Sequence, residues 1–288
     1  MLFQAELSPL TSDQHKARLM HPKYLIKSNF NASKMRISEF DDEIPKNFDA
    51  RQNWPECNSI RNIRDQSHCD VRECSPIEAW EYFMRNGACS GGDYGEAYVG
   101  VSHRTDEIPR CFEDVCKPYV FHPCGYHQNE IYYGKCPNHL FPTPSCKRVC
   151  QSGYNKSYEE DKIYGKSAYM VPNDETLIQK EIMKNGPVQA AFAVFEDFSH
   201  YKSGIYVHTA GKQEGGHAVK LIGWGVEGGI KYWLVANSWN TQWGENGYFR
   251  ILRGVNHCGI EEMVVAGMVD VERYRSGDKQ METHLLTK

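Results

Sequence analysis

The hydrophobic and polar positions in the second half of the chain follow two different periods. Residues 188–195, VQAAFAVF, form a continuous apolar run with the length of a buried strand. The stretch before it, 173–185, reads NDETLIQKEIMKN and places apolar residues at helical spacing. It starts with an Asn/Asp cap and is followed by Gly186-Pro187, which stops a helix. The pattern therefore predicts an amphipathic helix that leads into a buried strand.

Further along, two apolar runs flank a glycine pair. His217–Val226 and Tyr232–Ser238 are rich in Val, Leu, Ile, Tyr and Trp, and Gly228-Gly229 lies between them. Such a pattern predicts a β-hairpin. If the turn closes at the glycines, His217 and Asn237 lie on adjacent strands within a few positions of each other, although a slip in register would separate them.

A histidine beside an asparagine carbonyl has a specific chemical use. The Asn oxygen accepts the proton on one ring nitrogen, which leaves the other nitrogen free to take the proton of a thiol or hydroxyl. The alternative is structural: His217 is a packed strand histidine and Asn237 ends a strand.

The composition limits the classes of protein to which the chain can belong. The chain has 288 residues, 40% of them hydrophobic, and a formal net charge of −4, without the basic stripe typical of nucleic-acid binding. No apolar run reaches the roughly 20 residues of a membrane span. Eleven cysteines, most of them between Cys69 and Cys150, indicate disulfides in an oxidising compartment, with a zinc site as the alternative.

The start of the chain fits this compartment poorly. MLFQAELSPLTSDQHK lacks the apolar core of a signal peptide, so either a signal is missing from this sequence or the oxidising assignment is wrong. Asn31 and Asn155 each begin a glycosylation sequon, which favours the oxidising compartment.

Several motifs occur in a fixed order: GGHAV, GWG, YWLVANSW, WGENGYF and HCGIE. In this order they resemble the His and Asn region of papain-family cysteine peptidases, and of cathepsin B in particular. The resemblance implies an α+β, two-lobed papain-like fold with a helical left lobe and a β-barrel-like right lobe. It also implies a monomeric lysosomal or extracellular endopeptidase, without metal or cofactor, that acts on peptides or proteins and binds cystatin-type inhibitors.

The resemblance also divides the chain. IPKNFDARQNWPEC, from residue 44, resembles the mature amino terminus of cathepsin B. Residues 1–43 would then be a shortened inhibitory propeptide, or alternatively a disordered leader. The peptidase domain would span 44–268, with the left lobe mostly in 60–165 and the right lobe mostly in 166–268. The polar tail 269–288 has no counterpart.

By resemblance, His217 is the general base, Asn237 orients it, and Gln66 donates to the oxyanion. The family then has two cysteines three residues apart, followed by Trp. This chain instead has Cys69 and Cys74, five residues apart and without that Trp. The simplest account is that the segment with the nucleophile is absent and the left lobe is incomplete. Cys69 and Cys74 are the remaining candidate nucleophiles, and the alternative function is an inactive relative, or an incomplete splice product, with a binding role or none.

The resemblance assigns the remaining site residues. Glu261 would be an acid in the S2 subsite, His127 would bind a substrate carboxylate on the primed side, and Trp239 would lie among the substrate-binding residues. The implied disulfides are Cys116–Cys150, Cys124–Cys136 and Cys69–Cys74. The usual partners of Cys57 and Cys146 would lie in the absent segment.

Overall fold

The computed structural model describes residues 16, 18–25, 43–66, 75–94, 115–124, 132–135, 137 and 139–273. The chain divides into two compact units. The first comprises Met1–Ala79, Pro123–Thr143 and Ala168–Ala266, and the second comprises Trp80–His122, Pro144–Ser167 and Gly267–Lys288.

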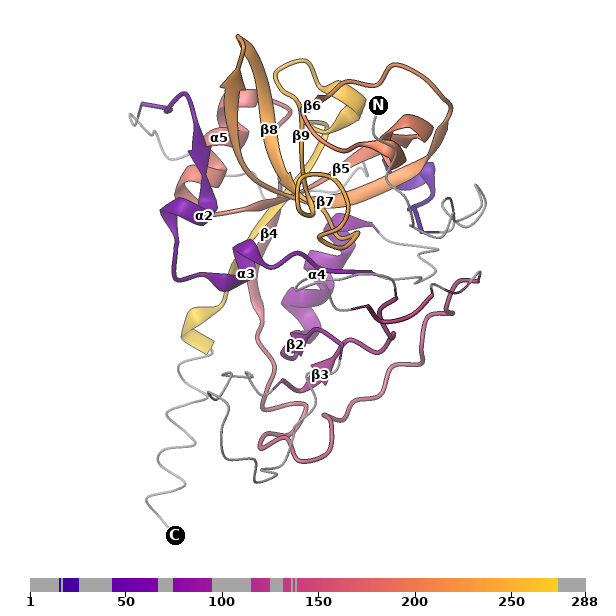
Figure 1. The fold of residues 1–288 in the computed structure, drawn as a ribbon. Coiled ribbons are helices and arrows are strands. Elements are labelled where there is room, and N and C mark those ends of the chain that lie inside the picture. Colours follow the sequence, from indigo (N-terminus) through magenta and orange to yellow (C-terminus); the bar gives the residue numbers. More distant parts are fainter. Residues whose placement is uncertain are drawn as a thin grey trace, which may run out of the picture. The chain divides into compact units, whose positions relative to one another are not determined.

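One sheet organises the first unit. In the described ranges it has eight strands in the order β4-β10-β5-β7-β8-β9-β6, and β1 pairs with β7 (Figure 1). Neighbours are antiparallel in most pairs, whereas β6 and β9 are parallel. The strands are β1 (Phe48–Asp49), β4 (Gly165–Val171), β5 (Val188–Phe195), β6 (Ile205–Tyr206), β7 (Gln213–Glu227), β8 (Ile230–Ala236), β9 (Tyr248–Leu252) and β10 (Met263–Val269).

Helices are few and short. The longest in the described ranges, α4 and α5, have 11 residues each. The α-helices are α2 (Ala50–Asn53), α3 (Asn58–Arg61), α4 (Pro76–Asn86) and α5 (Glu175–Asn185), and the 3₁₀ helices are η1 (Pro22–Leu25), η3 (Glu196–His200) and η4 (His257–Gly259).

The predicted helix and strand are both confirmed. Helix α5 starts at Glu175 because the Asp174 carboxylate accepts the Leu177 N–H at 2.9 Å. It ends at Gly186, whose φ of 98° suits glycine. The apolar run predicted at 188–195 is β5.

The hairpin is confirmed as well. Strands β7 and β8 pair in antiparallel register, from Glu227 opposite Ile230 to Lys220 opposite Ala236. Gly228 and Gly229 make the turn with φ values of 58° and 85°. The register shifts between Leu221 and Gly223, which is a bulge near the end that carries the predicted site.

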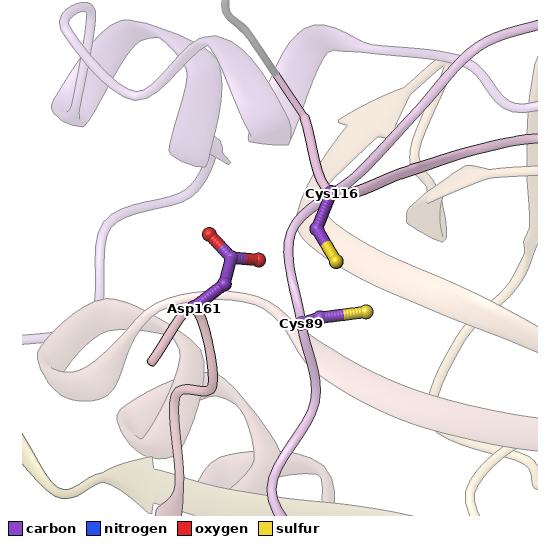
Figure 2. A group of neighbouring side chains, drawn as sticks. All are labelled: Cys89, Cys116 and Asp161. Atoms are coloured by element: carbon purple, nitrogen blue, oxygen red, sulfur yellow. The ribbon is translucent and has the colours of Figure 1, made fainter. Parts of the chain in front are cut away.

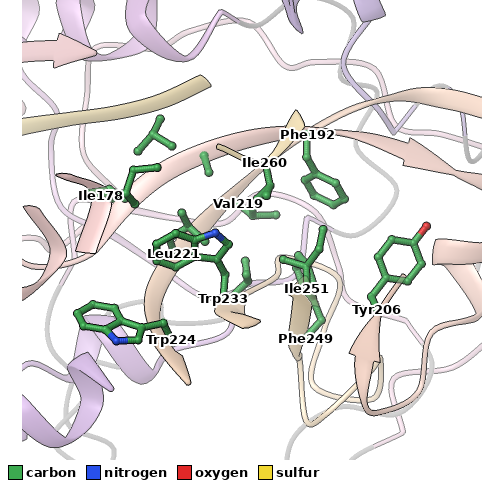
Figure 3. Close-up of a cluster of buried hydrophobic side chains, with 14 of the residues drawn as sticks. Ile178, Phe192, Tyr206, Val219, Leu221, Trp224, Trp233, Phe249, Ile251 and Ile260 are labelled. Atoms are coloured by element: carbon green, nitrogen blue, oxygen red, sulfur yellow. The ribbon is translucent and has the colours of Figure 1, made fainter. Parts of the chain in front are cut away.

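Apolar side chains of the sheet form the main core of the first unit (Figure 3). They are fully or almost fully buried, and they include Phe192, Leu221, Trp233, Phe249 and Ile251. Burial of each such side chain contributes about 1.5–3 kcal/mol to folding. This core fixes the strands from which the candidate site is built.

The second unit contains the parallel strand pair β2 (Gly91–Gly92) and β3 (Lys117–Pro118). A disulfide joins Cys116 to Cys150, as the resemblance implied.

The α+β class is confirmed by these elements. The incomplete left lobe stays a prediction, because residues 67–74 lie outside the described residues. Within the described part of the chain, no helix has the length and apolarity needed to span a membrane.

Candidate active site

The hairpin brings His217 and Asn237 together. His217 lies on β7 opposite Phe192 of β5, and Asn237 directly follows β8. Both side chains are buried, with 5% and 4% of their surface exposed. Nε2 of His217 lies 2.7 Å from Oδ1 of Asn237. The sequence predicted proximity between these residues, and the structure gives a direct hydrogen bond.

The hydrogen bonds around Asn237 define which ring nitrogen of His217 carries a proton. Oδ1 of Asn237 also accepts the Ser238 N–H at 2.8 Å, so it is an acceptor on both sides. Nε2 of His217 therefore donates, and its Nδ1 keeps a lone pair. The indole of Trp239 stacks on the imidazole, with ring centroids 4.8 Å apart, and restrains its orientation.

Burial sets the protonation state of this histidine. It lowers the pKa of His217 to about 4; the hydrogen bond with Asn237 raises the pKa, and the positive charge of Arg18 lowers it. The imidazole is therefore neutral near pH 7 and can act as a base at Nδ1.

Gln66 is held beside the same hairpin end. Its N–H donates to the Ser238 carbonyl at 2.9 Å, and its Oε1 accepts the Ser238 hydroxyl at 2.8 Å. These contacts orient the Gln66 side chain, whose Nε2 donates to the backbone carbonyl of Arg18 at 3.1 Å. Gln66 thus already donates a hydrogen bond to a peptide carbonyl, which is the chemistry that an oxyanion donor needs.

The segment 18–25 lies against this site. Met20 and Gly216 pair as an antiparallel bridge, one residue before His217. The Met20 side chain is 4% exposed and packs with Ala191 and Met263. A Cβ on Gly215 would lie 2.7 Å from Leu19 Cβ, so this approach needs a residue without a side chain.

Glu261 has surroundings that differ from those the resemblance implied. Its carboxylate is 3% exposed and accepts hydrogen bonds from the Trp233 indole N–H and the Gly254 and Asn256 backbone N–H groups, at 2.6–2.8 Å. The carboxylate is therefore held by groups of its own chain, and its place in the S2 subsite stays a prediction. The residue that faces Met20 from this part of the chain is Met263, two positions later.

Other predicted residues lie outside the described ones, so the structure is silent about them: Asn31, Cys69, Cys74, His127 and Cys136. Cys124 is disulfide-bonded, and its partner is also outside them. Cys57 and Cys146 are free and exposed. Asn155 is exposed, as a glycosylation acceptor must be.

Sequence reasoning missed three contributors, namely Arg18, Met20 and Ser238. Leu19-Met20 is a short apolar pair in a polar leader, and the Gly215-Gly216 pair begins the GGHAV motif. Together they are the signal that a second segment approaches β7.

Comparison with known proteins shows the family to which the chain belongs. Residues 72–268 match the family model of papain family cysteine proteases. The chain therefore belongs to the papain family. The matched range includes His217, Asn237 and Cys74, whereas Gln66 and Cys69 precede it.

Relatives place the chain within this family. It is 41% identical to cathepsin B-like cysteine proteinase 6 of Caenorhabditis elegans, over 89% of this chain and 75% of the relative. It is 53% identical to cathepsin B-like cysteine proteinase 3 of Ostertagia ostertagi, over 66% of this chain and all of the relative. The structure resembles procathepsin B S9 of Trypanosoma congolense with a TM-score of 0.69, at 27% identity, over 93% and 92% of the two chains.

The length of one alignment shows that a relative has residues that this chain lacks. The match to the C. elegans protein runs over 303 residues, more than the 288 residues of this chain. It therefore includes residues of the relative that have no counterpart here.

Proposed function

We propose that this chain carries the active site of a cathepsin B-like cysteine endopeptidase that hydrolyses peptide bonds in protein substrates. The buried His217–Asn237 hydrogen bond of 2.7 Å carries the proposal, and the adjacent Gln66 amide supports it. A packed structural histidine would not need an amide donor aimed at a peptide carbonyl beside it.

In this proposal a cysteine thiol loses its proton to Nδ1 of His217, and the thiolate attacks the substrate carbonyl carbon. The Gln66 amide stabilises the negative charge that develops on the carbonyl oxygen. His217 then donates the proton to the leaving amine, while Asn237 holds the ring in place. Water hydrolyses the acyl-enzyme. No step requires a metal or cofactor.

Cleavage requires a sulfur, and we assign that role to Cys69 or Cys74, which follow Gln66 by three and eight residues. A second candidate function has support of its own: a papain-family protein that binds peptides without cleaving them. The cysteine spacing differs from the family motif, and the longer alignment with the C. elegans relative indicates missing residues.

Residues 18–25 act in this proposal as a propeptide remnant that covers the site of a zymogen. Arg18 places a peptide carbonyl on Gln66, and Met20 occupies an apolar site formed by Ala191 and Met263. The same site would accept an apolar substrate side chain. From the family we also propose a lysosomal or extracellular location, N-glycosylation at Asn155 and inhibition by cystatin-type proteins.

An epoxysuccinyl peptide, which alkylates activated thiols, tests the two candidates. The full chain carries Met20→Ala, which loosens the segment that covers the site, and a peptidase then gives a covalent adduct at Cys69 or Cys74. That adduct disappears in His217→Ala and persists in His200→Ala, a change at an exposed histidine. Binding of a fluorescent peptide without any adduct selects the non-cleaving candidate. Absence of both adduct and peptide binding rejects both.

A further inference from the structure

A free thiol lies beside the disulfide of the second unit. The Sγ atoms of Cys89 and Cys116 and a carboxylate oxygen of Asp161 all lie within 4.8 Å of one another (Figure 2). Cys116 is joined to Cys150, whereas Cys89 is free. We propose that Cys89 is an exchange partner for this disulfide, so that the crosslink moves from Cys116–Cys150 to Cys89–Cys116.

The backbone around Cys89 holds the thiol in place. Ala88 exchanges hydrogen bonds of 2.8 and 2.9 Å with Ile163, and the carbonyl of Ser90 accepts the Lys117 N–H at 3.0 Å. The Ser90 hydroxyl accepts the Cys116 N–H at 2.8 Å. Cys89 is therefore fixed on both sides to the segments that carry its two neighbours, and its proximity to Cys116 is built into the fold.

The step needs no outside oxidant or reductant. The Cys89 thiolate attacks Sγ of Cys116, the Cys89–Cys116 bond forms, and the Cys116–Cys150 bond breaks. Cys150 leaves as a thiolate and takes up a proton in place of the one that Cys89 lost. One disulfide and one thiol are present before and after.

The surroundings keep this exchange slow at neutral pH. Burial raises the pKa of the Cys89 thiol and the negative charge of Asp161 raises it further, which outweighs the lowering by Lys117 and Lys162. Asp161 is fixed there because it accepts hydrogen bonds from Ser90 N–H, Ser90 Oγ and the Tyr154 hydroxyl. Since the thiolate is the attacking species, exchange should accelerate about tenfold per pH unit below that pKa.

Exchange would release one loop and close another. Cys150 ends a stretch in which residues 142–149 are all exposed, and this stretch would lose its covalent attachment. Gln151 would stay near, because its N–H donates to the Cys116 carbonyl at 2.8 Å. The released Cys150 thus remains beside its former partner, which makes the exchange reversible. This proposal does not depend on peptidase activity.

Disulfide mapping tests it. The native full chain is held at pH values from 6 to 9 without reductant, quenched in acid, alkylated and digested for mass spectrometry. We expect peptides linked through Cys89–Cys116 together with alkylated Cys150, at a rate that rises with pH and is independent of protein concentration. Only Cys116–Cys150 links with alkylated Cys89 at every pH would overturn the proposal.

Two variants sharpen the result. Cys89→Ser should abolish labelling of Cys150. Cys258→Ser should leave it unchanged, since Cys258 is also a half-buried free thiol whose burial raises its pKa, but it lies in the first unit. Links between Cys146 and Cys150 would assign the attack to the exposed Cys146 and would also overturn the proposal. The wild-type pH series decides the matter even if a variant folds poorly.

Discussion

Met20 and Gly216 exchange two backbone hydrogen bonds, Met20 N–H to Gly216 O at 2.8 Å and Gly216 N–H to Met20 O at 2.7 Å. They can do so because β7 is longer than its partner: β8 pairs with β7 only from Lys220 onwards. The earlier part of β7 pairs with β5 on one side and has an edge on the other, where Met20 adds by strand pairing. The same short edge leads directly into His217.

Met20→Ala should weaken this docking. The side chain is almost fully buried with Ala191 and Met263, and loss of such a methionine costs about 2–5 kcal/mol. A loss of about 2 kcal/mol would shift the docking equilibrium about 30-fold. Hydrogen exchange of the Gly216 amide measures it directly, because Met20 O accepts that N–H.

Lys23→Ala is the matched control, since Lys23 is exposed on the same segment. It should leave the Gly216 amide protected. If Met20→Ala also leaves Gly216 protected, the segment is held by contacts other than this side chain.

Helix α5 and the β7–β8 hairpin of the first unit could be predicted, because the residues that define them are close together in the sequence. An Asp cap and a terminal glycine define α5, and a glycine pair defines the β7–β8 turn. The His217–Asn237 contact could be predicted only to within a few positions, because the bulge between Leu221 and Gly223 shifts the register. Nothing in a hairpin pattern predicts such a bulge.

Other parts of the site depend on contacts between distant segments. Docking of Met20 joins the leader to β5, β7 and β10, which no periodicity reports. The surroundings of Glu261 also depend on distant segments. The resemblance implies an acid in the S2 subsite at this position, whereas in the structure Glu261 accepts a hydrogen bond from Trp233 and Met263 packs against Met20.

Glu261→Gln should reduce stability more than it alters ligand preference. Its carboxylate accepts N–H groups from Trp233, Gly254 and Asn256, and a glutamine would turn an NH₂ group toward one of these donors. A buried, poorly matched polar group costs about 1–3 kcal/mol. Urea unfolding measures the loss, and Glu262→Gln, at the half-buried neighbouring position, should cost less. Equal losses would contradict this account of Glu261.

Asp197 organises a second polar cluster in the first unit. It is partly buried, which raises its pKa, but the Thr209 N–H, the Tyr206 hydroxyl, His208 and the Ala210 N–H outweigh burial and hold the pKa below its usual range. A carboxylate so stabilised contributes stability above its unfolded pKa and loses it as pH falls.

Asp197→Asn should therefore lower the free energy of unfolding at pH 7 by about 1–3 kcal/mol, since the amide presents donors to donors. The difference from wild type should shrink toward acid pH, where the wild-type carboxylate takes up its proton. Urea titrations at several pH values measure this. Glu56→Gln at an exposed position is the control, and a deficit that stays constant with pH would argue against the role of charge.

His217 makes the sharpest prediction about pH. Burial lowers its pKa from 6.5 to about 4, so the unfolded chain binds a proton more readily than the folded chain. The stability from the neutral, buried ring is fully present above about pH 6.5 and is lost as pH falls toward 4. The shift corresponds to roughly 3 kcal/mol.

His217→Gln cannot take up that proton and should flatten the pH dependence of unfolding between pH 6.5 and 4. His200→Gln removes an exposed histidine and should leave the dependence as in wild type. Unfolding in urea, followed by tryptophan fluorescence at half-unit pH steps, resolves a slope of this size. If His217→Gln and wild type lose stability in parallel on acidification, folding leaves the pKa of His217 unchanged, and burial does not favour its neutral form.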